Sequence, residues 1–223
     1  ADAVASLRYR RRLDPFAGFV AGGGAARVLV CGGRRGGRAP HAQRSLRGGL
    51  RLGRTRAVRR PKHWTHVRVA RGWWDPLVSR SAEAHAREHA LEVQLPFIQH
   101  VLGDLPILPL VIGQVAPVAL ADLLDRLWHP GTLVLVSSDL SHYLPHAEAH
   151  ARDAATVRQI LALDDRIEPD QACGAFALRG FLHLARRRHL VPRLLDLRNS
   201  GDTAGDRRRV VGYAALAFAE ADA

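Results

Sequence analysis

The sequence is short of the features that mark exported and membrane proteins. Its two cysteines, Cys31 and Cys173, are too few for a disulfide framework. No apolar run approaches the roughly 20 residues of a membrane-spanning helix, and the N-terminus has no apolar segment of the kind that signal peptides carry. We therefore expect a cytoplasmic protein without a membrane partner. The 223 residues, 47% of them hydrophobic, are enough for one sizeable domain with a packed core.

Acidic residues are scarce in the first third of the chain. Residues 1–74 carry 18 of the 33 basic residues but only Asp2 and Asp14 as acids, which gives a net charge of +16. Residues 75–223 carry 15 basic and 19 acidic residues, which gives −4. Because the two parts follow different compositional rules, we divide the chain into an Arg/Gly-rich N-terminal segment, 1–74, and a domain, 75–223.

The N-terminal segment contains 12 of the 20 glycines and one credible strand, 26–31. Three interpretations stay open. It is a basic arm that binds nucleic acid by neutralising phosphates, a solvated tail without a partner, or in part a translation outside the evolved reading frame. The last interpretation rests on composition, because one lysine against 32 arginines indicates GC-rich coding DNA, and residues 1–74 contain no glutamate.

Helix and strand patterns alternate beyond Asp75. The order is helix 82–99, strand 105–113, helix 118–128 and strand 132–136, with further helices at 145–163 and 175–189 and strands at 194–198 and 210–218. This alternation predicts the α/β class with a mostly parallel sheet. Pro96 is predicted to kink or interrupt the first helix, because proline lacks the N–H that a helix interior uses.

A polar cluster follows the buried strand 132–136. In open α/β sheets, ligands bind beyond the carboxyl ends of the strands. Asp139 and His142 are therefore expected at the mouth of a site, as an acid and a titratable base three residues apart. The alternative is that Asp139 caps a helix and His142 lies on the surface. Of the histidines His142, His146 and His150, we keep only His142, because the others share a face that Glu148 and Arg152 mark as solvated.

Cys173 lies at the start of the helix predicted over 175–189. A thiol near a helix N-terminus favours the thiolate, which is the nucleophilic and metal-binding form; the alternative is a buried structural cysteine. Asn199, Ser200 and Asp202 follow a strand in a loop dense in turn formers, so they fit either a site or ordinary turn chemistry.

Four motifs in one order resemble the Memo family, whose bacterial members are called AmmeMemoRadiSam system protein B. They are EHALEVQLPF at 88–97, SSDLSHY at 137–143, ACG at 172–174, and NSGD at 199–202 with VGYAA at 211–215. The family is similar to class III extradiol dioxygenases. The resemblance covers residues 75–220 and implies a three-layer α/β/α, extradiol-dioxygenase-like fold with a pocket of the non-haem iron type.

The resemblance also implies roles for individual residues. Asp139 and His142 would be catalytic, and Cys173 would bind the metal together with His41 and His63. The pocket would be lined by Glu88, His89, Ser138, Asn199, Ser200 and Asp202. The two N-terminal histidines match the family motifs only in part, as Pro40-His41-Ala42 and as His63 two residues after Pro61. Loss of that half of the site would leave an inactive, damaged copy of the family without the metal.

The implied chemistry is a metal-dependent redox reaction, dioxygenase-like, on a small molecule. Iron is the first choice of metal, and copper or zinc follow, because imidazole suits all three and a thiolate favours softer metals. The alternative function is a non-catalytic protein that binds a peptide or partner in the same pocket, because a fold does not fix an activity. Nucleic acid is a partner only if the basic segment 1–74 is genuine.

Overall fold

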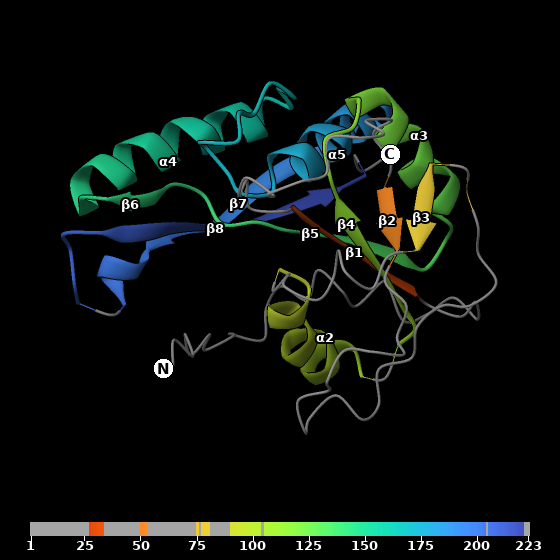
Figure 1. Cartoon of the computed structure of the whole chain (residues 1–223), viewed down its shortest axis with the longest axis horizontal. Helices are drawn as coiled ribbons and strands as arrows, with labels where there is room; N and C mark the ends of the chain where they lie inside the picture. The colour runs from red at the N-terminus through yellow and green to blue at the C-terminus, as the bar shows by residue number, and fades with distance from the viewer. Residues whose placement is uncertain are drawn as a thin grey trace, which may run out of the picture.

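The computed structural model describes residues 27–33, 50–52, 75, 77–80, 90–103, 105–203 and 205–220. Five strands form one sheet in the order β3-β2-β4-β1-β5. They are β1 (Arg27–Gly33), β2 (Leu50–Leu52), β3 (Val78–Arg80), β4 (Ile107–Ile112) and β5 (Thr132–Ser137). Strand β1 pairs in parallel with β4 and β5, and β2 pairs in parallel with β3 but antiparallel with β4 (Figure 1). The predicted strand at 26–31 is thus β1.

Three more strands form a second sheet in the order β6-β8-β7. They are β6 (His142–Leu144), β7 (Val191–Asn199) and β8 (Val210–Ala219), and both pairings are antiparallel. The predicted α/β class is confirmed. The pairings of the first sheet are parallel except that of β2 with β4, whereas the strands predicted at 194–198 and 210–218 lie in this antiparallel second sheet. The physical reason is the short connection from β7 to β8, which closes an antiparallel hairpin, whereas parallel neighbours need a crossover of a dozen residues or more.

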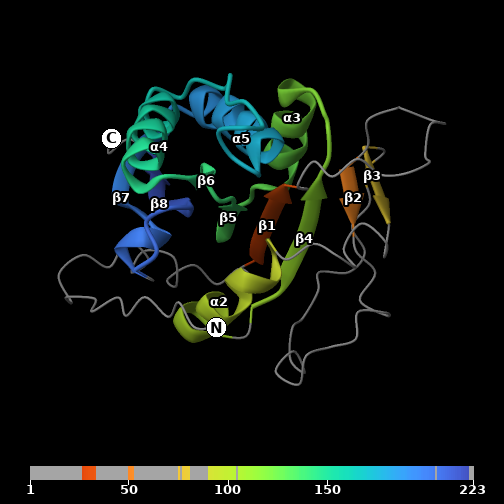
Figure 2. The same cartoon turned by 60° about the vertical axis from the view of Figure 1, so that its left-hand side comes forward.

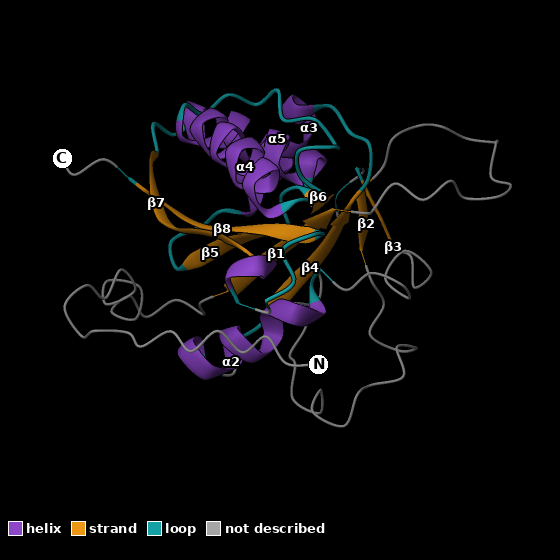
Figure 3. Ribbon diagram, turned by 90° about the vertical axis from the view of Figure 1, so that its left-hand side faces the viewer, coloured by secondary structure: helices purple, strands orange, loops and turns teal. Residues whose placement is uncertain are grey.

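Helices cover both sides of the strands. Figure 3 shows α3 (Pro117–Leu127), α4 (His146–Leu161) and α5 (Ala175–Arg187) on one side and α2 (Leu95–Leu102) on the other. A turn of 3-10 helix, Glu92–Gln94, leads into α2. Among the described residues, no helix combines the length and the apolar character needed to cross a membrane.

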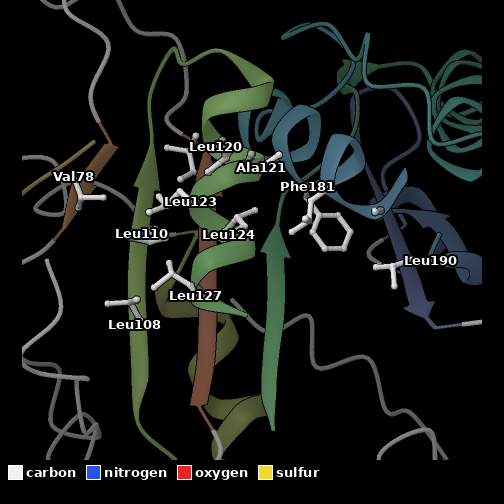
Figure 4. Close-up of a cluster of buried hydrophobic side chains, with 14 residues drawn as sticks. Val78, Leu108, Leu110, Leu120, Ala121, Leu123, Leu124, Leu127, Phe181 and Leu190 are labelled. Atoms are coloured by element: carbon white, nitrogen blue, oxygen red, sulfur yellow. The ribbon is translucent and has the colours of Figure 1, made fainter. Parts of the chain in front are cut away.

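The largest core cluster lies under α3. The leucine stripe predicted for this helix is buried and faces Leu108 and Leu110 of β4, as Figure 4 shows; its members are Leu120, Leu123, Leu124 and Leu127. Phe181 of α5 extends the cluster and makes an edge-to-face contact with Phe218 of β8, with ring centroids 4.8 Å apart. This core packs α5 against β1 and β5 of the first sheet (Figure 2) and, through Phe181, against β8 of the second. Cys173 lies two residues before the start of α5 and is held in place with it.

Pro96 does not interrupt a helix, contrary to the prediction. It lies in the first turn of α2, where the missing N–H would have no intrahelical partner in any case. The proline therefore starts the helix. The apolar face predicted around it is still present, because Leu91, Leu95 and Ile98 are buried together against Ile107 and Val111 of β4.

Candidate metal centre

The centre lies where the first sheet passes into the second. Strand β5 ends at Ser137, Asp139 follows two residues later, and β6 begins at His142. Cys173 comes from the turn before α5, whose N-cap is Gly174. Residues far apart in the sequence thus meet at the carboxyl end of β5, the edge that the sequence pattern indicated.

Two hydrogen bonds that involve the backbone hold Cys173 against Asp139. The N–H of Asp139 donates to Cys173 Sγ at 3.1 Å, and the N–H of Cys173 donates to the carbonyl oxygen of Asp139 at 3.2 Å. Ser138 Oγ lies 3.7 Å from the same sulfur and accepts from the N–H of Gly174 at 2.8 Å. The sulfur therefore accepts a hydrogen bond from the backbone of Asp139, which fixes its position at the end of β5.

An imidazole and a carboxylate complete the group. His142 Nε2 lies 3.4 Å from Asp139 Oδ2, and the two side chains are 21% and 35% exposed. The pair is half-buried, so a ligand from solvent can reach it. A carboxylate beside a histidine ring also fixes the orientation of that ring.

The donor set fits a metal ion. The ligand atoms of Asp139, His142 and Cys173 all lie within 4.8 Å of one another. Two ligands of one transition-metal ion, at bond lengths of about 2.0–2.3 Å, are at most about 4.5 Å apart. Neighbouring ligands in a tetrahedral or octahedral site lie about 3–3.8 Å apart, so the most distant of these atoms would have to move closer by up to about 1 Å to share one ion. Thiolate, imidazole and carboxylate together suit iron and zinc better than magnesium or calcium, which take oxygen ligands alone.

The structure thus brings together three residues that the sequence had given to two different roles. Asp139 and His142 were expected as catalytic groups and Cys173 as a metal ligand, and all three lie in one cluster with Ser138 beside it. The other expected metal ligands and two expected pocket residues lie outside the described residues; these are His41, His63, Glu88 and His89.

The remaining predicted pocket residues form a turn. Asn199 caps the 3-10 turn Ser200–Asp202: its side chain accepts from the N–H of Gly201 at 3.0 Å, and its own N–H donates to Asp202 at 2.9 Å. That hydrogen bond, followed by the contact with His146, holds the pKa of the Asp202 carboxyl below its usual value. The sequence left open whether these side chains belong to a site or to a turn. In the structure, Asn199 and Asp202 stabilise the turn.

This turn still supports the centre indirectly. Ser200 Oγ accepts from the N–H of Val211 at 3.1 Å, and Val211 pairs with His142 across β8 and β6. The sequence reasoning set His146 aside as solvated, whereas its ring is 24% exposed and lies 2.7 Å from Asp202. The signal was the histidine spacing itself, which was discounted because of charged neighbours on the same helix.

The fold and the site define an α/β protein with a half-buried cluster of a cysteine sulfur, an imidazole and a carboxyl group at a strand end. Comparison with known sequences identifies its family. The family model described as Memo-like protein matches residues 74–217. The chain therefore belongs to the Memo family, as its motifs indicated.

Curated relatives match this chain over part of their length. The MEMO1 family protein of Metallosphaera sedula is 35% identical over 158 residues, which cover 65% of this chain and 56% of the relative. That of Desulfurococcus amylolyticus is 36% identical over 149 residues, with 60% and 53% covered. That of Archaeoglobus fulgidus is 34% identical over 148 residues, with 60% and 56% covered. The chain thus spans about half the length of the curated relatives it matches.

Proposed function

We propose that this chain is a metal-dependent redox protein, in which Asp139, His142 and Cys173 hold a divalent metal, iron in the first place. The carrying observation is that their three ligand atoms converge within 4.8 Å at the end of β5. By resemblance to the family, His41 and His63 would add two further ligands. The substrate would be a small molecule that binds at the half-exposed side of the cluster.

A fold more specific than the α/β class is part of this proposal. We take the arrangement to be the three-layer α/β/α fold of the extradiol-dioxygenase-like proteins, and helices on both sides of the strands favour it. Bound iron would supply the redox chemistry and polarise an oxygen-bearing substrate. The chain itself would position the substrate and move protons.

The cluster assigns those tasks to named groups. Asp139 and His142 would both be ligands, since Asp139 Oδ2 and His142 Nε2 lie 3.4 Å apart and a ligand atom of each lies within 4.8 Å of the sulfur. Only a His142 ring that is not bound to the metal would be free to serve as acid or base toward a bound substrate. The sulfur of Cys173 is held by the backbone of Asp139, so one segment places all three groups.

A second candidate is a non-catalytic protein that binds a peptide or a small ligand at the same place. Tyr143 favours it: the ring is next to His142, with centroids 5.8 Å apart, and the residue is 55% exposed. Arg209 stacks over that ring at 5.0 Å. An exposed aromatic ring beside a cation is a surface that can hold a ligand without any chemistry.

Metal titration under anaerobic conditions separates the two candidates. The first predicts about one iron or cobalt(II) ion per chain and a cobalt–thiolate absorption band that disappears in Cys173→Ser. Removal of a group that hydrogen-bonds a metal ligand lowers metal affinity roughly 10–100-fold. His142→Gln removes a proposed ligand itself, so it should lower the affinity by more than that. Cys31→Ser is the matched control and should keep the band. A chain that binds neither iron, cobalt nor zinc stoichiometrically would leave only the binding function.

Cellular location and nucleic acid stay open to direct tests. We propose a cytoplasmic protein, and a role of segment 1–74 in nucleic-acid binding would show as DNA retention that falls steeply with salt and is lost when the segment is removed.

A further inference from the structure

A carboxylate is buried next to the centre, and the proposed chemistry does not use it. Asp153 lies on α4, on the face that also buries Ala149, Val157 and Ile160, and is 1% exposed. Its Oδ1 accepts from the N–H of Ser141 at 2.9 Å. Its Oδ2 has no hydrogen-bond partner among the described residues. A buried acid with so little compensation is costly, so it calls for a physical reason.

The fold makes room for this carboxylate. Gly212 of β8 lies against it, and a Cβ at Gly212 would overlap Asp153 Oδ2. The backbone of Gly212 also accepts from the N–H of Leu140 at 2.9 Å and donates to the carbonyl oxygen of Ser141 at 2.9 Å. The segment 140–141 is therefore hydrogen-bonded by two elements: the side chain of Asp153 from α4 and the backbone of β8.

The gripped segment is the one that joins the two ligands. Asp139 precedes it, His142 follows it, and the N–H of Asp139 holds the sulfur of Cys173. A shift of the Ser141 backbone would move both neighbours and the sulfur contact with them.

We propose that Asp153 is a positioning residue of the metal centre, which acts through the N–H of Ser141 to fix the segment that carries Asp139 and His142. The proposal rests on the proposed function, because it concerns the same centre. It gives the buried carboxyl group a role that core packing alone does not explain. An apolar residue would fill the space without providing the acceptor.

The structure supplies matched variants. Asp153→Asn keeps the volume and an acceptor oxygen, whereas Asp153→Ala removes the acceptor. Ser141→Ala is the control: it keeps the backbone N–H and removes a buried hydroxyl that has no hydrogen-bond partner among the described residues. Asp153→Leu is held in reserve, because it removes the acceptor without leaving a buried charge or a large cavity, which protects folding.

Cobalt(II) is the probe, added to the full chain without oxygen. Asp153→Ala should weaken cobalt binding by about 10–100-fold, the usual effect of removing a group that orients ligands. It should also change the cobalt–thiolate band at saturation, which a purely structural residue would not do. Asp153→Asn should restore most of the affinity and the parental band, and Ser141→Ala should match the parent in both.

A metal-free measurement separates this proposal from the proposed function. In a Cys31→Ser background, iodoacetamide alkylates Cys173 at a rate that depends on how the Asp139 segment covers the sulfur. Asp153→Ala should raise that rate several-fold, and Asp153→Asn should not. If the parent binds no cobalt, the metal function fails, and the alkylation rates still decide the positioning role. Parental alkylation in folded Asp153→Ala or Asp153→Leu, or an equal change in Ser141→Ala, would overturn the proposal.

Discussion

Gly174 is the position at which one added carbon should disturb the centre most directly. It follows Cys173, and its N–H donates to Ser138 Oγ at 2.8 Å. A Cβ there would lie 2.7 Å from Ser138 Cβ, 2.9 Å from Ser138 Oγ and 3.1 Å from the carbonyl oxygen of Ser137. Its φ of −93° and ψ of 23° suit alanine, so steric overlap alone decides the effect. We expect Gly174→Ala to lose both stability and metal.

The magnitude follows from three terms. Overpacking costs about 1–3 kcal/mol, and a strained or broken hydrogen bond to Ser138 about 0.5–1.5 kcal/mol. Against these, replacing glycine by alanine at a compatible φ stabilises by about 0.4–1 kcal/mol. The crowded atom of Ser138 is its Cβ, which cannot swing away, so the backbone must move. The expected result is a net loss of about 0.5–4 kcal/mol in the free energy of unfolding.

Urea unfolding and cobalt titration measure the two effects. The loss of stability should appear as a lower unfolding midpoint with an unchanged slope. Cobalt affinity should fall about 10–100-fold, because Cys173 moves away from Asp139. The control is Gly113→Ala, where a Cβ meets nothing within 4 Å, so stability should stay level or rise slightly. Gly174→Ala with parental stability and parental cobalt affinity would refute the steric argument.

Three further outcomes are expected. Gly180→Ala on α5 should lower the free energy of unfolding by about 1–2 kcal/mol, despite the better helix propensity of alanine, because its Cβ would overlap the fully buried Leu120; a rise in urea midpoint would contradict this. The folded-state pKa of Asp202 lies below its unfolded value, so its contribution is present at neutral pH and lost as pH falls below about 4. Asp202→Asn should therefore show a smaller drop in stability between about pH 7 and pH 3 than the parent. Cobalt at 100 times its dissociation constant should stabilise the chain by about 2.7 kcal/mol, an effect that a chelator and Cys173→Ser should each remove; a thermal shift assay decides this.

Local signals in the sequence predicted most of the elements around the centre. The leucine stripe from Leu120 to Leu127 has the helical period and is buried as expected. The apolar run of β5, bounded by Gly131 and the serines, was enough to place a strand, but its four apolar residues, Leu133 to Val136, are half-buried and not buried on both faces as expected. Such features depend on neighbours within one or two turns, which the sequence shows directly.

Features that depend on distant partners were missed. The position of Pro96 in the first turn of α2 depends on where that helix begins, and a helical apolar face alone does not mark the start. Strand β6 is three residues long and includes Tyr143 at a φ of 62°, so no alternation could reveal it. It exists because β8 pairs with it.

The centre itself could be predicted only in part. The end of β5 pointed to Asp139 and His142, because strand ends in α/β sheets gather polar groups. Nothing local joined Cys173 to Asp139 across 34 positions; that contact depends on how α5 packs against both sheets. The buried position of Asp153 had a signal that was not used: it lies four residues before Val157 and seven before Ile160, on one helix face.

The geometry has a consequence for how the centre would respond to metal. Asp139 and Cys173 exchange two backbone-linked hydrogen bonds, N–H to sulfur and N–H to carbonyl, and neither bond needs an ion. The segment between Asp139 and His142 is held by Asp153 and by β8 in the same way. A site preformed by the fold differs from a structural zinc site, in which metal binding and folding are one event. Removal of metal should therefore lower the melting temperature without unfolding the domain, and circular dichroism of the chelated protein at room temperature should show the same helix and strand content as the metal-loaded protein.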